Sequence, residues 1–228
     1  SLANLINLDG LTTGTITAKV TETRTDQLVA AGTGLVSGHN IAVDVATSNG
    51  VLTVHDPATI NDLNNRTTGR VTVTGGTLSG LAADLKTAFA ANTNNADLVA
   101  TSQLAGLETL GTTITDATVN AADINTIDTA TTGVVTVNST TVTGLSADIQ
   151  TAFDGNTVAN RTANLAAQAI TVTDTITVAQ ANAHAADTTG VVTATISEQS
   201  FTGATNLTQL STANSETTVG GDTRNAYT

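Results

Sequence analysis

The chain has very few of the residues that usually fill a thick protein core. It contains no Cys, Met or Trp, and only three Phe and one Tyr. The absence of cysteine excludes disulfides, thiol catalysis and thiolate metal sites. Small residues stand in place of the large ones, and Thr alone supplies about a fifth of the chain. We therefore expect a thin and regular core, which suggests a repeat protein.

Basic residues are also scarce. Seven Lys and Arg stand against nineteen Asp and Glu, so the formal net charge is −12. Binding to a phosphate backbone needs clusters of Lys or Arg, so we expect no nucleic-acid partner. The same charge disfavours an anionic membrane surface. No run approaches the ~18 apolar residues of a membrane span, so we expect no membrane insertion.

A repeated Thr-Thr-Gly motif organises the sequence. Successive glycines of the motif lie 55, 64 and 57 residues apart. After each glycine, apolar residues alternate with threonine, and this period of two predicts a strand with its threonines facing out. The chain is interpreted as one elongated repeat array over residues 1–228, a segment of a longer protein. Its units, about four, are anchored at Gly14, Gly69, Gly133 and Gly190.

The segment before each motif has helical spacing. Apolar residues recur twelve, nine and six positions upstream of the glycine, which predicts a short helix with one buried face. Residues 78–89 match residues 142–153 at a constant offset of 64, and we predict a further helix there. A second strand is predicted at 114–116 and at 170–174, with 51–56 as its equivalent in the first unit. Asn225 to Thr228 has the pattern of the beginning of a strand.

Strands separated by helical crossovers are expected to be parallel, with right-handed connections. We therefore predict an α/β repeat solenoid, in which parallel strands stack with short helices between them. A pure parallel β-solenoid is the nearest alternative.

One segment resembles known repeats. Residues 170–197, ITVTDTITVAQANAHAADTTGVVTATIS, are similar to the tandem repeats of very large cyanobacterial and other bacterial cell-surface proteins of the adhesin or haemagglutinin kind. The resemblance implies an extracellular, tandemly repeated and non-catalytic role. It implies no binding residues.

Candidate chemistry is sparse. The histidines fall in different units, and His184 is expected to cover a helix face while partly exposed. Asp56, Asp116 and Asp174 recur at predicted strand ends, so stacking would bring them into a column that calcium could bridge. The alternative is that each aspartate caps its own turn or the next helix. Apart from this calcium, no cofactor is expected, and no catalytic residue is identified.

The predicted function is a structural or adhesive spacer of a large bacterial surface protein, outside the cell. Its partners would be neighbouring repeats of the same chain or copies of itself, with surface glycans as a further partner. The alternatives are a calcium-dependent module that binds glycans or cells, and a phage tail-fibre shaft. The outward threonines could also form an ice-binding array, but Lys19, Arg70, Val134 and Asn138 interrupt it on the same face. The β-branched preference of threonine for strands and Thr–Thr pairing across a ladder are the ordinary explanation, which we favour.

Overall fold

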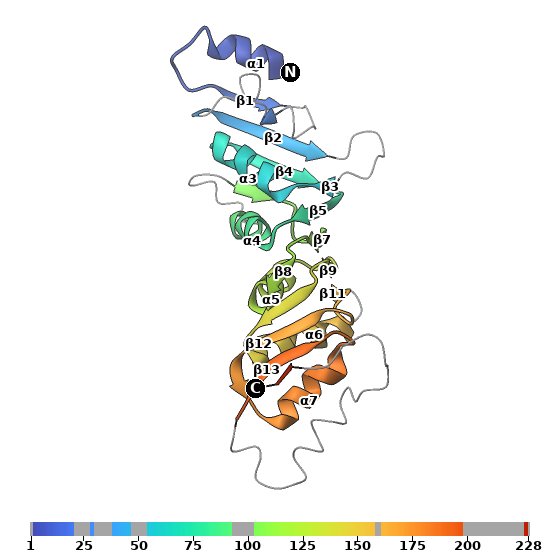
Figure 1. Ribbon diagram of the computed structural model, residues 1–228. Coiled ribbons are helices and arrows are strands. Elements are labelled where there is room, and N and C mark those ends of the chain that lie inside the picture. Colours follow the sequence, from blue (N-terminus) through green and yellow to red (C-terminus); the bar gives the residue numbers. More distant parts are fainter. Residues whose placement is uncertain are drawn as a thin grey trace, which may run out of the picture. The chain divides into compact units, whose positions relative to one another are not determined.

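Helices and strands alternate along the chain in the computed structural model (Figure 1). The structure describes residues 2–20, 28–29, 38–46, 54–92, 103–157, 161–197 and 226–227. Two compact units are present, and each is described by itself. The first comprises Ser1–Ile114 with Thr129–Val134, and the second comprises Thr115–Asp128 with Val135–Thr228.

The first unit contains two parallel sheets. One sheet has the order β1-β2-β4-β6, and β3, β5 and β7 follow one another in the other. The helices and strands of this unit are α1 (Leu2–Asp9), β1 (Thr17–Val20), β2 (Asn40–Ala46), β3 (Val54–His55), α3 (Pro57–Arg66), β4 (Arg70–Thr74), β5 (Thr77–Gly80), α4 (Ala82–Ala91), β6 (Gln103–Ala105) and β7 (Gly111–Ile114).

The second unit is built in the same way. One parallel sheet has the order β8-β10-β12-β13-β14, and β9 pairs with β11. Helix α5 begins in this unit and ends in the first. The helices and strands are β8 (Thr118–Asn120), α5 (Ala121–Ala130), β9 (Val135–Val137), β10 (Thr141–Gly144), α6 (Ser146–Thr157), β11 (Thr162–Ala163), β12 (Ala169–Ile176), α7 (Val178–Asp187), β13 (Val192–Ile196) and β14 (Ala226–Tyr227).

Every strand pair that the structure describes within a unit is parallel, which confirms that prediction. Paired residues are separated by about half the spacing of the glycines. Val43 pairs with Val71, 28 positions later, and Thr118 pairs with Thr141, 23 positions later. Each Thr-Thr-Gly period therefore corresponds to two strand steps.

The predicted inward residues form the core. The second position after each motif glycine is buried, and its four residues are Ile16, Val71, Val135 and Val192. The intervening threonines are exposed or half-buried. Two positions further on, Val73, Val137 and Ala194 are buried, whereas Ala18 in the first unit is half-buried. The period-two assignment of inward and outward faces is thus correct.

A helix forms before each motif as predicted, but the predicted buried face is incomplete on α1, where Leu8 is 47% exposed. Ile60 and Leu63 on α3, and Ile124 and Ile127 on α5, are fully buried. Asp56 caps the N-terminus of α3, because its carboxylate accepts from the Ala58 amide at 3.2 Å. Helix α3 packs beside α4, and α6 packs beside α7 (Figure 1).

The predicted helices at 78–89 and 142–153 are wrong in their first residues. Strands β5 and β10 occupy Thr77–Gly80 and Thr141–Gly144, and α4 and α6 begin only after them. Leu78 and Val142 are buried between less buried neighbours, so period-two burial decides the conformation there. The strand ends with Gly80, whose position leaves no room for a side chain, since a Cβ would lie 2.5 Å from Pro57 Cγ.

The second predicted strands are partly correct. Strand β12 covers residues 170–174, but β7 ends at Ile114, so Thr115 and Asp116 lie beyond it. Residues 54–55 of the segment 51–56 form β3, and Ala226–Tyr227 form β14. Residues 51–53, 225 and 228 lie outside the described residues.

The inward assignment predicts an asymmetry between neighbouring substitutions in β9. Val135 is fully buried, so Val135→Asp should cost several kcal/mol of unfolding free energy, because it buries an unpaired carboxylate. Thr136 is half-buried, and Thr136→Asp should cost less than about 1 kcal/mol. Urea unfolding measures both. If Val135→Asp does not fold, Val135→Thr serves in its place. Equal losses for the two positions would contradict the assignment.

Candidate functional site

A buried threonine hydroxyl joins the second Thr-Thr-Gly motif to residues 39–41, where strand β2 begins. Thr67 Oγ1 lies 2.7 Å from the Ile41 carbonyl and 3.1 Å from the His39 carbonyl. It also accepts from the amides of Ile41, at 2.8 Å, and Gly69, at 2.9 Å. The Thr68 amide donates to the His39 carbonyl at 3.0 Å. We call this set of bonds the Thr-Thr-Gly contact, and residues 39–41 its receiving segment.

The third motif makes the same contact. Thr131 Oγ1 lies 2.9 Å from the Leu110 carbonyl and 3.3 Å from that of Glu108, and it accepts from the Gly133 amide at 3.0 Å. The Thr132 amide donates to the Glu108 carbonyl at 2.8 Å. The receiving segment is therefore 108–110, directly before β7.

The fourth motif repeats the contact in the second unit. Thr188 Oγ1 lies 2.6 Å from the Gln168 carbonyl and 3.3 Å from the Ala166 carbonyl, and the Gly190 amide donates to it at 2.9 Å. The Thr189 amide donates to the Ala166 carbonyl at 2.8 Å. Three motifs thus bind the segment before an earlier strand with one geometry.

The glycine of the contact is required by close approach of two backbones. A Cβ on Gly69 would lie 2.3 Å from the Ile41 carbonyl carbon. One on Gly133 would lie 2.3 Å from the Leu110 carbonyl oxygen, and one on Gly190 would lie 2.4 Å from that of Gln168. Main-chain atoms cannot turn aside as a flexible side chain can, so any larger residue must separate the two segments.

The sequence identifies the Thr-Thr-Gly side of the contact but not its partner. The receiving segments read His-Asn-Ile, Glu-Thr-Leu and Ala-Ala-Gln. They share no residue, because only their main-chain groups take part. The feature of the sequence that could locate a receiving segment is its position at or directly before the start of a buried strand.

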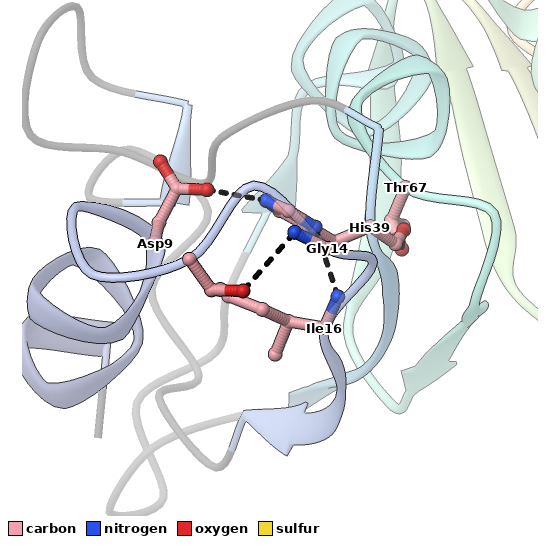
Figure 2. A network of polar contacts seen from close by, with 6 residues as sticks. Asp9, Gly14, Ile16, His39 and Thr67 are labelled. Atoms are coloured by element: carbon pink, nitrogen blue, oxygen red, sulfur yellow. Dashed lines mark hydrogen bonds and ion pairs between the residues drawn. The ribbon is translucent and has the colours of Figure 1, made fainter.

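Around the first receiving segment, His39 links three elements (Figure 2). Its Nδ1 accepts from the Ile16 amide at 3.1 Å, so the proton of the neutral ring lies on Nε2. Nε2 then donates to the Asp9 carboxylate at 2.5 Å. Asp9 stands three residues before the first motif. Asp128 stands three residues before the third motif, and it pairs with Arg161. The His39–Asp9 hydrogen bond and the Arg161–Asp128 ion pair each tie the last turn of a helix to a later segment of the chain.

Two of the three predicted calcium ligands, Asp116 and Asp174, belong to the second unit. Asp116 lies two residues before Thr118, and Asp174 lies five residues after Ala169, while the ladder places Thr118, Thr141 and Ala169 at one level. These two aspartates therefore stand at different levels of the sheet. Asp56 belongs to the first unit and caps α3. A calcium site at these residues stays a prediction.

Asp174 has a structural partner as well. Its carboxylate accepts from the Ser146 amide at 2.8 Å, at the beginning of α6. A carboxylate at this position compensates the partial positive charge of the helix N-terminus. Among the described residues, no group of three or more His, Cys, Asp or Glu is placed to hold a metal ion.

His184 is buried, which corrects the expectation that it is partly exposed. It is 1% exposed, and its Nε2 lies 2.8 Å from Ser146 Oγ. The two side chains have the geometry of a nucleophilic serine and its general base. Because 38 residues separate them, the sequence gives no signal of this pair. Ser146 is itself 4% exposed, however, and His184 Nδ1 has no hydrogen-bond partner. A base without an orienting carboxylate, below the surface, lacks two requirements of nucleophilic catalysis.

The pKa values of His184 and of its neighbour Asp187 reflect their burial. Desolvation lowers the pKa of His184, although Asp187 and Asp174 oppose the shift. Desolvation also raises the pKa of Asp187, which accepts a hydrogen bond from Gln150. The neutral imidazole is therefore the form that the fold prefers.

Comparison with known proteins gives no relative from which a function could be carried over. No family model, no curated protein and no solved structure matches the chain. In the described ranges, no helix is long and apolar enough to cross a membrane.

The contact predicts that one glycine is indispensable and another is not. Gly190→Ala should lower the free energy of unfolding by about 1–3 kcal/mol, because its Cβ overlaps the Gln168 carbonyl. Gly14→Ala should be neutral or slightly stabilising, since a Cβ there meets only Thr12 Oγ1 at 3.4 Å. Urea unfolding of both variants tests this. A Gly190→Ala variant as stable as the wild type would mean that the contact is not formed.

The buried histidine predicts a dependence of stability on pH. His184 stays neutral in the folded chain, whereas the unfolded chain binds a proton below its ordinary pKa of 6.5. Stability should therefore be fully present above pH 6.5 and fall as the pH decreases from there. His184→Leu, which introduces the residue of the equivalent position 63, should reduce this fall between pH 7.5 and 5.5. Burial lowers the pKa of His55 as well, so this residue contributes to the same fall. Identical pH profiles for variant and wild type would contradict the assignment.

Proposed function

We propose that this chain is a repeat solenoid that serves as a structural or adhesive spacer outside a bacterial cell. The observation that carries the proposal is the Thr-Thr-Gly contact, which recurs at Thr67, Thr131 and Thr188. Each of these hydroxyls lies within hydrogen-bond distance of two carbonyls of the receiving segment and accepts from the amide of the motif glycine. In each case a helix and a strand are fixed onto the segment before an earlier parallel strand. A contact that each motif makes with an earlier segment adds units in one direction, as in other stacked repeat proteins.

The composition of the core favours an extended array of units over a single domain with one enclosed core. The fully buried side chains are mostly Ile, Leu, Val and Ala. They are carried on short helices and strands, most of which contact the next helix or the next strand but one. Such a unit buries its apolar surface only when another unit covers it. Each added unit then lengthens the array, which suits a spacer.

A non-catalytic role is supported by the chemistry of the polar groups. The buried threonines, Asp56 and Asp174 all bind backbone groups, and the Ser146–His184 pair lies below the surface. These groups are thus engaged in holding the fold. Calcium binding has no comparable support, because the aspartates proposed for it already cap helices or stand apart.

An extracellular place on a large surface protein rests on the sequence. The resemblance of residues 170–197 to bacterial surface repeats suggests it. Neighbouring repeats or further copies would be the main partners, and surface glycans would contact the exposed threonine faces. The formal net charge of −12 at pH 7 would make such spacers repel anionic surfaces.

Small-angle X-ray scattering tests the solenoid directly. A compact domain of 228 residues would have a radius of gyration of about 17 Å. A stacked array should give a clearly larger value and a pair-distance distribution with a long tail. The measurement is made at low protein concentration and in 0.15 M salt, about physiological ionic strength, so that association and repulsion do not distort it. A value near the compact one would rule out the solenoid and the spacer with it.

A further inference from the structure

Each Thr-Thr-Gly contact closes a loop of the chain. The contact between Thr188 and the Gln168 carbonyl joins two residues 20 positions apart, and strand β12 and helix α7 lie between them. The other two contacts join residues 21 and 26 positions apart. As long as a contact holds, a pull along the chain passes directly from one side of the contact to the other. The residues of the loop then carry no load and add nothing to the length of the chain.

The strand ladder supports the same path for the load. Strands β12 and β13 pair in parallel, and Ile170 faces Val192, which lies 22 positions later. The main-chain hydrogen bonds of this ladder run from strand to strand, across the sheet. A pull that separates β13 from the chain before β12 therefore acts on the ladder and on the contact together. The loop between the two strands is released only when both give way.

Helices of the second unit pack on strands that are close to them in the chain. Helix α7 packs on β12 and β13, and helix α6 packs on β10, β11 and β12 and on α7. In stacked arrangements of this kind, each layer is stabilised by the layers beside it. One loop can therefore open locally while the rest of the unit stays folded.

The chemistry of the contact suits a link that opens and closes. Thr188 is buried, so its hydrogen bonds are shielded from water while the two segments are together. Gly190 approaches so closely that a Cβ would lie 2.4 Å from the Gln168 carbonyl oxygen. A half-open contact would leave buried polar groups without partners, so opening is expected to be abrupt. The chain contains no Cys, so no disulfide prevents the opening.

The loops are also short enough to close again quickly. A loop of about 10 residues closes in about 10–100 ns, and the entropy cost of closure rises only slowly with loop length. Neighbouring layers that stay folded keep the receiving segment in place. The released length is therefore recovered when the pull falls.

We propose that the chain is an extensible tether, in which each Thr-Thr-Gly contact is a link that opens under tension and releases the loop that it closes. Releasing 20–26 residues lengthens the chain by about 70–90 Å, since an extended residue spans about 3.5 Å. The lengthening limits the load that reaches whatever the two sides of the tether hold. This inference rests on the proposed function, because only a spacer attached at both sides is placed under tension.

Single-molecule stretching with optical tweezers tests the link at Thr188. Because the chain has no Cys, two introduced cysteines define where the handles are attached. Ala167→Cys and Thr193→Cys stand on either side of the contact, and both residues are exposed. A rising pull should open the link in one abrupt event that lengthens the molecule by about 70 Å, and the link should close when the pull is lowered. Gradual lengthening without such an event, or an opening that is not reversed, would overturn the proposal.

Two substitutions at Thr188 test whether its hydroxyl holds the link. Thr188→Val should raise the rate of opening at a fixed pull about tenfold or more, because buried hydrogen bonds are lost. Thr188→Ser keeps the hydroxyl and should open more slowly than Thr188→Val. Thr151→Val is the matched control, because this exposed hydroxyl donates to the Ala147 carbonyl of its own helix. A Thr188→Val link that opens at the wild-type rate would contradict the proposal. If Thr188→Val does not fold, the wild-type event decides.

A second pair of handles tests whether the links open separately. Thr109 is exposed as well, and between Thr109→Cys and Thr193→Cys the contacts of Thr131 and Thr188 lie in series. At least two separate events are expected, because each link closes its own loop. A single event that releases the whole segment would overturn the tether.

Failure of the tether and failure of the spacer are distinguishable. A large radius of gyration, together with a link that Thr188→Val leaves unchanged, would remove the tether alone. A compact radius of gyration would remove the spacer, whatever the links do under tension.

Discussion

The fold depends on a hydroxyl group that is buried at each Thr-Thr-Gly contact. The threonine follows a helix directly at Arg66, Ala130 and Asp187, and the strand begins shortly after the glycine. Its Oγ1 accepts from the glycine amide and lies within hydrogen-bond distance of two carbonyls of another segment. Helix end, strand start and preceding strand are thereby fixed by one atom. In a core whose described large aromatic residues are Phe89 and Phe153, this polar contact supplies positional specificity that shape complementarity of many large side chains provides elsewhere.

The helices and strands that the sequence predicts correctly are those in which the hydrophobic pattern repeats over several residues. Alternating Val and Thr identify β4, β9 and β13, and the three-residue spacing of Ile60 and Leu63 identifies α3. The segments at 78–89 and 142–153 were assigned to helices because the helical residues Leu85 and Phe89 dominate their pattern. The four residues that precede each helix are too few for a period, and the tertiary ladder makes them strands. Short strands such as β6 and β11 carry no recognisable pattern for the same reason.

The polar groups were predicted less well, because their partners are distant in sequence. Stacking Asp116 above Asp174 assumed that both end the same strand of successive units. The ladder instead places one before a strand and the other near the end of a strand. His184 occupies a position that Leu63 and Ile127 fill elsewhere, and its burial follows from that equivalence more reliably than from its polarity. Ser146, its partner, is supplied by another helix, so no local motif reveals the pair.

The receiving segments contribute only main-chain groups to the Thr-Thr-Gly contact, so the contact leaves the identity of their side chains free. The last residue of each segment, Ile41, Leu110 or Gln168, is nevertheless buried, whereas the middle residue, Asn40, Thr109 or Ala167, is exposed. The contact thus holds in place a side chain that faces solvent and that it does not constrain. Changes at the three middle positions could give the molecule new surfaces while its framework stays constant.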